Sequence, residues 1–333
     1  MTKQFEKYGR ISVGQSRVFL DRCVLSANIK AVTRSLDSKG LGLRAVVKGG
    51  FQRNEILSTI EAEGITSIAV SDLGMLNSFS GSVLKLYPSA PPKLATPDRS
   101  QIVTEVSLET IRQYVNRKTG NKHPLNLDIP VLTHERREGL EIAEIPGFIE
   151  KGIREFGSHV NIRSLQANFG CVQSTLPNDT FLAEIFETFR VLKRRFGGAA
   201  PSSVSLGGSQ LLAGLDSIQF YSDINTEFRI GETILAGTIP NAGPLKGCLP
   251  VFSVDTTVLQ KRTRGPNCDF VLDIGSTHIS KQSLTRHFPK AEILSVSSEI
   301  CVFSCQTDMA PKQFQKFTLP LSYNDCLRSL PNL

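Results

Sequence analysis

The amino-acid sequence predicts an α/β protein, in which a closed, TIM-type (β/α)8 barrel is followed by a small, mainly antiparallel β domain. From Leu43 onward, short β-branched runs alternate with longer helical patterns, which is typical of βα units and a parallel sheet. Eight such strand-like runs occur over about 190 residues, and this is the outline of a closed barrel. Beyond Leu235 the helical periodicity fades, and Gly, Pro and Asn separate further strand-like runs. An open, doubly wound sheet is the alternative for the first part.

The elements follow one another along the chain in a regular order. A strand near residues 18–20 leads to Asp21, which is predicted to cap a helix with apolar positions at Leu25 and Ile29. The eight barrel strands are predicted at residues 43–47, 67–70, 83–87, 102–106, 127–132, 161–167, 203–206 and 227–230. The clearest helices between them are predicted at 108–115, 143–156 and 179–196. The strands of the second domain are predicted at 251–258, 270–274, 291–296, 300–304 and 317–319.

The length of the chain and a change in its hydrophobic pattern predict two domains. The chain has 333 residues, and a domain averages about 150 residues. The change of pattern places the boundary between Thr238 and Leu249, a segment rich in Gly, Pro and Asn. We therefore expect a barrel domain with an N-terminal strand at 1–240 and a β domain at 241–333.

Composition and charge exclude several classes of protein. With 40% hydrophobic and 21% charged residues, the chain is neither disordered nor a coiled coil. The net charge of +7 comes from scattered basic residues with no aromatic residues between them, so nucleic-acid binding is not expected. No apolar run reaches the roughly 18 residues of a membrane span, and the N-terminus lacks the apolar core of a signal peptide. We expect a cytoplasmic protein.

Cysteine, histidine and glycine patterns exclude other kinds of site. The seven Cys are an odd number without CxxC spacing, and the five His are dispersed. Neither a disulfide framework nor a metal site is therefore expected. No GxGxxG motif opens a helix, so a dinucleotide site has no support.

Lys48 follows the first barrel strand directly, at the end where chemistry collects in such barrels. Burial of an ammonium group is costly and lowers its pKa, which suits a lysine that forms a Schiff base. A lysine that extends from the strand end into solvent is the alternative on position alone.

A phosphate site is predicted after the seventh strand, where Gly207, Gly208 and Ser209 follow one another. Glycines let the backbone approach a ligand, and Ser209 begins a short helix. The loops after strands seven and eight are the usual phosphate site of this fold. A lysine at strand one with a phosphate site at strands seven and eight describes a pyridoxal phosphate (PLP) site.

Six stretches of the chain carry a family resemblance by their order and spacing. They are Val46-Val47-Lys48, Glu135-Arg136-Arg137-Glu138-Gly139, Gln166-Ala167-Asn168-Phe169-Gly170, Leu206-Gly207-Gly208-Ser209, Arg229-Ile230-Gly231-Glu232-Thr233-Ile234-Leu235-Ala236-Gly237 and Leu319-Pro320-Leu321-Ser322-Tyr323-Asn324. The chain resembles the alanine racemase superfamily of PLP enzymes, and within it most resembles the ornithine racemase branch. The resemblance runs along nearly the whole chain, and the stretch from Arg229 to Gly237 is its most specific part.

The resemblance implies roles for Lys48 and Arg229. Lys48 would hold PLP as a Schiff base and move the substrate α-proton on one face. Arg229 would face the pyridine nitrogen of the cofactor. Because a guanidinium cannot accept the ring proton, reprotonation of the carbanion would be favoured over transamination.

The resemblance also implies a set of cofactor contacts. Ser209 and the backbone N–H groups of Gly231 and Glu232 would hold the phosphate, and Tyr323 would complete that site. Asn168 would lie beside the ring, where alanine racemases have a His. An ordinary β-domain core residue is the alternative for Tyr323, and a strand cap is the alternative for Asn168.

Arg137 is similar in context to the arginine that lies near the substrate carboxylate in the family. A guanidinium fork suits a carboxylate. Arg137 is better placed than Arg136 by register, although either residue could be the one on the surface.

The resemblance is incomplete at the second proton carrier. Racemisation needs an acid–base group on each face of the carbanion, and alanine racemases supply the second as a β-domain Tyr across a dimer interface. This chain has no Tyr between residues 249 and 299. Ornithine racemases carry a Gly-Glu-Ile-Gly segment there, and this chain has the shorter segment 260–269. Cys268 and His278 are the available groups; Cys268 ranks slightly ahead, with a small buried hydrophobe as the alternative role.

These observations predict a PLP-dependent amino-acid racemase for ornithine or a related or broader set of amino acids, with Lys48 and Cys268 as catalytic residues. A PLP-dependent decarboxylase of the same fold is the enzymatic alternative. A non-catalytic PLP-binding protein is the other. The resemblance further implies a homodimer with the site near the subunit interface.

Overall fold

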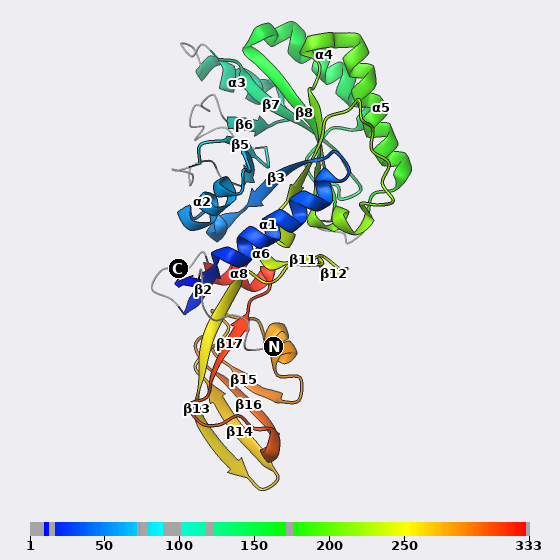
Figure 1. The fold of residues 1–333 in the computed structure, drawn as a ribbon. Coiled ribbons are helices and arrows are strands. Elements are labelled where there is room, and N and C mark those ends of the chain that lie inside the picture. The colour runs from blue at the N-terminus through cyan, green and yellow to red at the C-terminus, as the bar shows by residue number, and fades with distance from the viewer. Residues whose placement is uncertain are drawn as a thin grey trace.

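The computed structural model describes residues 10–12, 17–71, 73, 79–88, 101–117, 123–170 and 176–330. These residues form a closed barrel of eight parallel strands and a separate, largely antiparallel sheet of seven strands (Figure 1). The predicted fold class, a barrel followed by a β domain, is confirmed.

The barrel strands are those that the sequence predicts. In spatial order they are β3 (Gly42–Val47), β4 (Ser67–Val70), β5 (Ser82–Lys85), β6 (Gln101–Thr104), β7 (Leu125–Val131), β8 (Val160–Asn168), β9 (Ser203–Gly207) and β10 (Thr226–Ile230). The sheet closes because β10 pairs in parallel with β3. All carboxyl ends of these strands therefore meet at one mouth of the barrel.

Helices cover the outside of the barrel. They are α1 (Arg22–Asp37), α2 (Asn54–Ala62), α3 (Leu108–Arg117), α4 (Ile145–Phe156), α5 (Asp179–Phe196) and the short α6 (Glu232–Ala236). The predicted helices at 108–115, 143–156 and 179–196 correspond to α3, α4 and α5. Among the helices of the described residues, none is long and apolar enough to cross a membrane.

Helix α1 begins where the sequence predicts. The Asp21 carboxylate accepts hydrogen bonds from the backbone N–H groups of Cys23 and Val24, at 2.9 and 3.0 Å. These bonds satisfy two of the N–H groups that a helix N-terminus leaves unpaired. The apolar face of the helix is buried at Leu25, Ile29, Val32 and Leu36.

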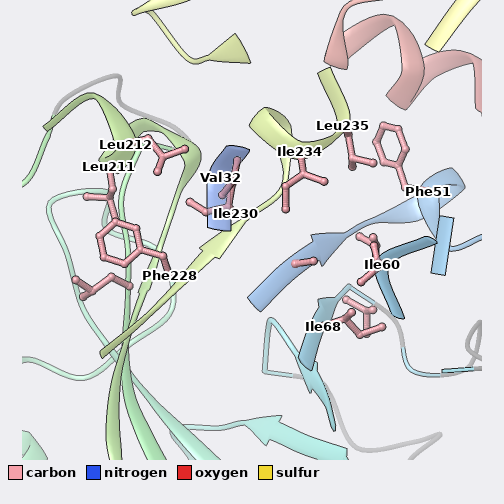
Figure 2. Packing of buried hydrophobic residues seen from close by; sticks show 14 of the residues in the cluster. Val32, Phe51, Ile60, Ile68, Leu211, Leu212, Phe228, Ile230, Ile234 and Leu235 are labelled. Atoms are coloured by element: carbon pink, nitrogen blue, oxygen red, sulfur yellow. The ribbon is translucent and has the colours of Figure 1, made fainter. Parts of the chain in front are cut away.

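Figure 2 shows part of the core that this helix completes. Val32 of α1, Ile230 of β10 and Ile234 of α6 belong to one buried cluster. Phe51 and Leu235 belong to the same cluster, so the turn after β3 is packed against α6. The packing fixes the ends of β3 and β10, from which the candidate site is built.

The sheet of the second domain contains seven strands. They are β1 (Arg10–Ser12), β2 (Val18–Asp21), β13 (Phe252–Arg264), β14 (Asn267–Leu272), β15 (Glu292–Val296), β16 (Cys301–Gln306) and β17 (Lys316–Pro320). Two helices that the sequence analysis did not identify, α7 (Lys281–His287) and α8 (Tyr323–Ser329), accompany them.

The N-terminal strands belong to this second sheet, because β2 pairs with β13. The sequence analysis assigns residues 1–240 to the barrel domain, N-terminal strand included. A short strand carries no signal for a pairing partner more than 200 residues away, so this pairing is visible only in the structure. The hairpin of β11 (Thr238–Ile239) and β12 (Gly243–Pro244) lies in the predicted boundary region.

Candidate active site

Lys48 lies at the barrel mouth, directly after β3 and before the turn η1 (Gly49–Phe51). Its Nζ atom is 5.8 Å from the centre of the Tyr87 ring, which follows β5. The guanidinium carbon of Arg137, in the loop after β7, is 5.2 Å from the same ring centre. Tyr87 therefore brings the predicted cofactor lysine and the predicted carboxylate-binding arginine together. The sequence analysis did not identify Tyr87; its position at a strand end was the available signal.

The two turns predicted to hold a phosphate are in contact. The Ser209 hydroxyl accepts a hydrogen bond from the backbone N–H of Thr233 at 3.3 Å, which joins the turn after β9 to the turn after β10. Gly208 has a φ of 119°, and a Cβ there would lie 1.9 Å from the carbonyl oxygen of Phe169. Only glycine fits this position. Gly231 and Glu232 belong to the second turn, so three of the predicted phosphate residues, Ser209, Gly231 and Glu232, lie together.

The Glu232 side chain makes a contact of its own. Its carboxylate accepts a hydrogen bond from the Thr238 hydroxyl at 3.4 Å. Burial raises the pKa of the Glu232 carboxyl above its ordinary value. The side chain therefore anchors the short helix α6 to the hairpin that follows it.

Arg229 lies inside the barrel and is only 1% exposed. Its Nη1 atom donates to the carbonyl oxygen and the hydroxyl of Ser205, both at 2.7 Å. Its Nη2 atom donates to the Ala167 carbonyl oxygen at 3.0 Å and to Asn168 Oδ1 at 2.7 Å. A Cβ at Gly207 would lie 2.3 Å from Asn168 Oδ1 and 2.5 Å from Arg229 Nη2, so glycine makes room for this contact. The guanidinium is held rigidly on two sides.

Asn168 and Arg137 share one acceptor. Glu138 Oε1 accepts from Asn168 Nδ2 at 3.2 Å and from Arg137 Nη2 at 3.0 Å. Arg137 also lies 3.7 Å from Glu135 Oε2, a carboxylate whose side chain is fully buried. Arg136 is exposed. Arg137 is thus the residue that the structure places among the other site residues.

A second ion pair lies deeper in the barrel. Arg44 Nε is 3.0 Å from Glu227 Oε1, and Arg44 Nη2 donates to Glu227 Oε2 at 3.1 Å. The Ser205 hydroxyl donates to Glu227 Oε1 at 2.6 Å and accepts from Arg229. The Ser205 hydroxyl therefore links Arg229 to the ion pair of Glu227 and Arg44. The sequence analysis missed them, although a charged residue within an otherwise buried strand was a usable signal.

Asp128 of β7 completes this charged group. It is fully buried, and its carboxyl lies beside the Ser164 hydroxyl, whose hydrogen bond lowers the pKa of the group. Burial raises the pKa of the Asp128 carboxyl to about 6, against the opposing effect of Arg44 and with a further increase from Glu227. In the folded protein Asp128 therefore keeps its proton until the pH reaches about 6.

This pKa gives a prediction for stability. In the folded protein the pKa of Asp128 is higher than in the unfolded chain. Between about pH 4 and about pH 6 the carboxyl is therefore ionised in the unfolded chain but still protonated in the folded protein, so the free energy of unfolding falls as the pH rises. We expect Asp128→Asn to leave stability unchanged below pH 4 and to raise it by about 3 kcal/mol above pH 6. Urea unfolding across this pH range measures the difference. A variant that is less stable at pH 7 than at pH 4, relative to the wild type, would contradict the prediction.

Tyr323 lies beside the turn that follows Lys48. Its ring stacks on Phe51, with centres 5.4 Å apart and planes inclined by 12°. Arg53 donates to the Leu330 carbonyl oxygen at 3.0 Å and so joins the same turn to the end of α8. The structure thus brings Tyr323 to the η1 side of the barrel mouth.

Within one chain, the structure does not bring Cys268 or His278 to the residues at the barrel mouth. Cys268 is fully buried on β14, opposite Cys305, and its Sγ atom lies 3.6 Å from the Asp269 carbonyl oxygen. Strand β14 lies at the end of the second domain far from the barrel (Figure 1). His278 contacts Thr277, with its Nδ1 atom 2.9 Å from the hydroxyl. In the described part of the chain there is no group of three or more potential metal ligands.

Comparisons with solved structures show the same fold at low sequence identity. The alanine racemase from E. faecalis has a TM-score of 0.67 and 14% identity, covering 96% of this chain and 98% of that chain. The alanine racemase from Oenococcus oeni has a TM-score of 0.64 and 16% identity, with coverages of 94% and 93%. The D-threo-3-hydroxyaspartate dehydratase from Delftia sp. HT23 has a TM-score of 0.68 and 12% identity, with coverages of 96% and 93%. No curated protein sequence matches the chain.

A family comparison goes further than these likenesses of fold. The model of the alanine racemase N-terminal domain matches residues 20–237, which span the barrel and the predicted residues Lys48, Arg137, Asn168, Ser209 and Arg229. The chain therefore belongs to the alanine racemase N-terminal domain family, whose cofactor is pyridoxal phosphate.

Proposed function

We propose that this protein is a PLP-dependent racemase of ornithine or a related cationic amino acid, or of a broader set of amino acids. The observation that carries the proposal is the buried guanidinium of Arg229, which is held by Ser205 and Asn168 at the mouth where Lys48 lies. This group can donate but cannot accept a proton. It therefore suits a reaction that returns the proton to Cα.

The residues at the barrel mouth fit PLP. Lys48 supplies a primary amine, Ser209 a hydroxyl next to a glycine turn, and Arg229 a fixed cationic donor. When bound, PLP acts as an electron sink for negative charge at Cα. Lys48 Nζ would take or return the α-proton on one face, and Arg137 would bind the substrate carboxylate.

Acidic side chains at the mouth support a cationic substrate. Glu105 directly follows β6 and is buried; its Oε1 atom accepts from the backbone N–H groups of Val106 and Ser107. Its Oε2 atom has no hydrogen-bond partner among the described residues. Burial raises the pKa of this carboxyl, while the two backbone N–H groups and the charge of Lys85 lower it. A substrate ammonium group would favour the ionised form.

Proton NMR in D₂O tests the proposal. Purified protein with PLP is incubated with a panel of L-amino acids, and the α-proton signal is followed. We expect the signal of ornithine or a related amino acid to disappear, and chiral analysis to find the D-isomer. Release of CO₂ with formation of an amine would instead identify a decarboxylase. No exchange on any amino acid, with PLP bound, would support a non-catalytic PLP-binding protein.

The second proton carrier is proposed to be a β-domain group of the partner subunit in a homodimer. Cys268→Ala tests the residue that the sequence favours for this role. Because the thiol is fully buried on β14, we expect α-proton exchange to stay within about twofold of the wild type, apart from a loss of stability of roughly 1 kcal/mol. Cys305→Ala, the cross-strand neighbour, is the control for that loss. Lost exchange with PLP still bound, in Cys268→Ala alone, would instead make Cys268 the second base.

A further inference from the structure

A carboxylate oxygen of Glu138 connects Arg137, which is proposed to bind the substrate carboxylate, to Arg229, which is proposed to face the cofactor. Glu138 Oε1 accepts from Arg137 Nη2 and from Asn168 Nδ2, and Asn168 Oδ1 in turn accepts from Arg229 Nη2. Every step of this path lies between 2.7 and 3.2 Å. The four residues come from the loop after β7, from β8 and from β10, so no single element of structure holds them together.

The chemistry of Glu138 determines how Asn168 is oriented. A carboxylate can only accept hydrogen bonds, so the Asn168 amide must present its NH₂ group to Glu138. The amide oxygen then points to Arg229, which can only donate. With an acceptor on one side and a donor on the other, the amide has one orientation that satisfies both.

We propose that Glu138 is a positioning residue that couples carboxylate binding at Arg137 to the hydrogen bonding of Arg229. This inference rests on the proposed function in that Arg137 is the residue that binds the substrate carboxylate. An incoming carboxylate competes with Glu138 for the Arg137 guanidinium. Glu138 Oε1 then accepts a hydrogen bond from Asn168 alone. The Asn168 amide shifts as a result, and the geometry of its hydrogen bond with Arg229 changes.

The competing charges around Arg137 are few in the described part of the chain. Glu138 lies 3.0 Å from the guanidinium, and Glu135 lies 3.7 Å from it. The Glu138 side chain is 17% exposed, so its replacement leaves no unpaired charge deep in the core. A substitution here therefore tests the coupling with less risk to folding than one at Arg229.

The experiment compares wild type and Glu138→Gln as holoproteins, with propionate as a carboxylate that has no α-amine. Calorimetry measures propionate affinity, and absorbance measures the response of bound PLP. We expect Glu138→Gln to bind propionate as tightly as the wild type or up to about fivefold more tightly, because a competing charge is lost. The absorbance change at saturating propionate should fall to less than about half of the wild-type change, since the variant lacks the shared carboxylate.

Two further variants complete the design. Glu138→Asp retains a carboxylate and should recover part of the absorbance response. Glu184→Gln makes the same chemical change at an exposed position on α5 and should match the wild type in both measurements. Thermal unfolding of each holoprotein identifies any general loss of structure.

Defined results would overturn the proposal. The first is a full absorbance response in Glu138→Gln. The second is a Glu138→Gln variant that binds propionate more weakly and melts at a lower temperature, while its absorbance response per bound propionate is unchanged. The third is a wild-type holoprotein whose PLP absorbance does not respond to propionate. Absence of α-proton exchange in the wild type would count against the racemase function alone, because neither propionate measurement depends on turnover.

Discussion

Replacement of Lys48 by alanine is expected to abolish the absorbance of lysine-bound PLP and to lower α-proton exchange by about 10²–10⁴-fold. Lys48 directly follows β3 at the barrel mouth, next to Tyr87. Its amine is both the proposed attachment point of the cofactor and the proposed proton carrier on one face. Absorbance of the purified protein with added PLP, together with NMR exchange in D₂O, measures both losses.

Lys85→Ala is the matched control for Lys48→Ala. Lys85 also ends a barrel strand at the same mouth, but its ammonium group donates to the Tyr87 carbonyl oxygen at 3.0 Å. We expect this variant to keep the absorbance of lysine-bound PLP. Borohydride reduction followed by peptide mapping should place the cofactor on Lys48 alone. An unchanged spectrum in Lys48→Ala would refute the assignment.

Replacement of Arg229 by leucine is expected to lower the free energy of unfolding by about 3–5 kcal/mol. The side chain is buried and donates to Ser205, Ala167 and Asn168. Its loss leaves these acceptors unsatisfied and removes a positive charge from the neighbourhood of Asp128, whose pKa it lowers. Urea unfolding with and without PLP measures the change. The absorbance of bound PLP should change as well, because the guanidinium is proposed to face the ring nitrogen.

Arg44→Leu separates these two effects. Arg44 is the register neighbour of Arg229 on β3 and pairs with Glu227, below the barrel mouth. We expect a comparable loss of stability, because Glu227, whose side chain is only 18% exposed, remains without its counter-charge. The absorbance of bound PLP should change much less than in Arg229→Leu. Equal spectral changes in the two variants would show that the spectrum reports general loosening of the barrel.

Much of the fold follows from local patterns in the sequence. The eight barrel strands and the helices α3, α4 and α5 each have a run or a period that is complete within a few residues. The cap of α1 at Asp21 is equally local. The pairing of β2 with β13 was not predicted, because it depends on residues that are far apart in the chain.

The candidate site likewise contains residues that the sequence predicts and residues that it does not. Lys48, Ser209 and Arg229 are strand-end or strand residues, and barrel geometry alone predicts that such residues converge. The supporting pair of Arg44 and Glu227 is different, because 183 residues separate the partners and the bond depends on how far each side chain reaches. The stretch 135–139 that carries the family resemblance includes Glu138 but implies no role for it, and its contacts with Arg137 and Asn168 are visible only in the structure.

The packing of α8 on the turn after Lys48 has a consequence for how the protein is made. Arg53 and Leu330, which connect the two, are 277 residues apart in sequence. During synthesis, the barrel strands leave the ribosome well before α8 does, and contacts of such long range form late. The surroundings of Lys48 are therefore completed only when α8 docks. Stable capture of the cofactor should follow that docking, which makes cofactor loading a late marker of successful maturation.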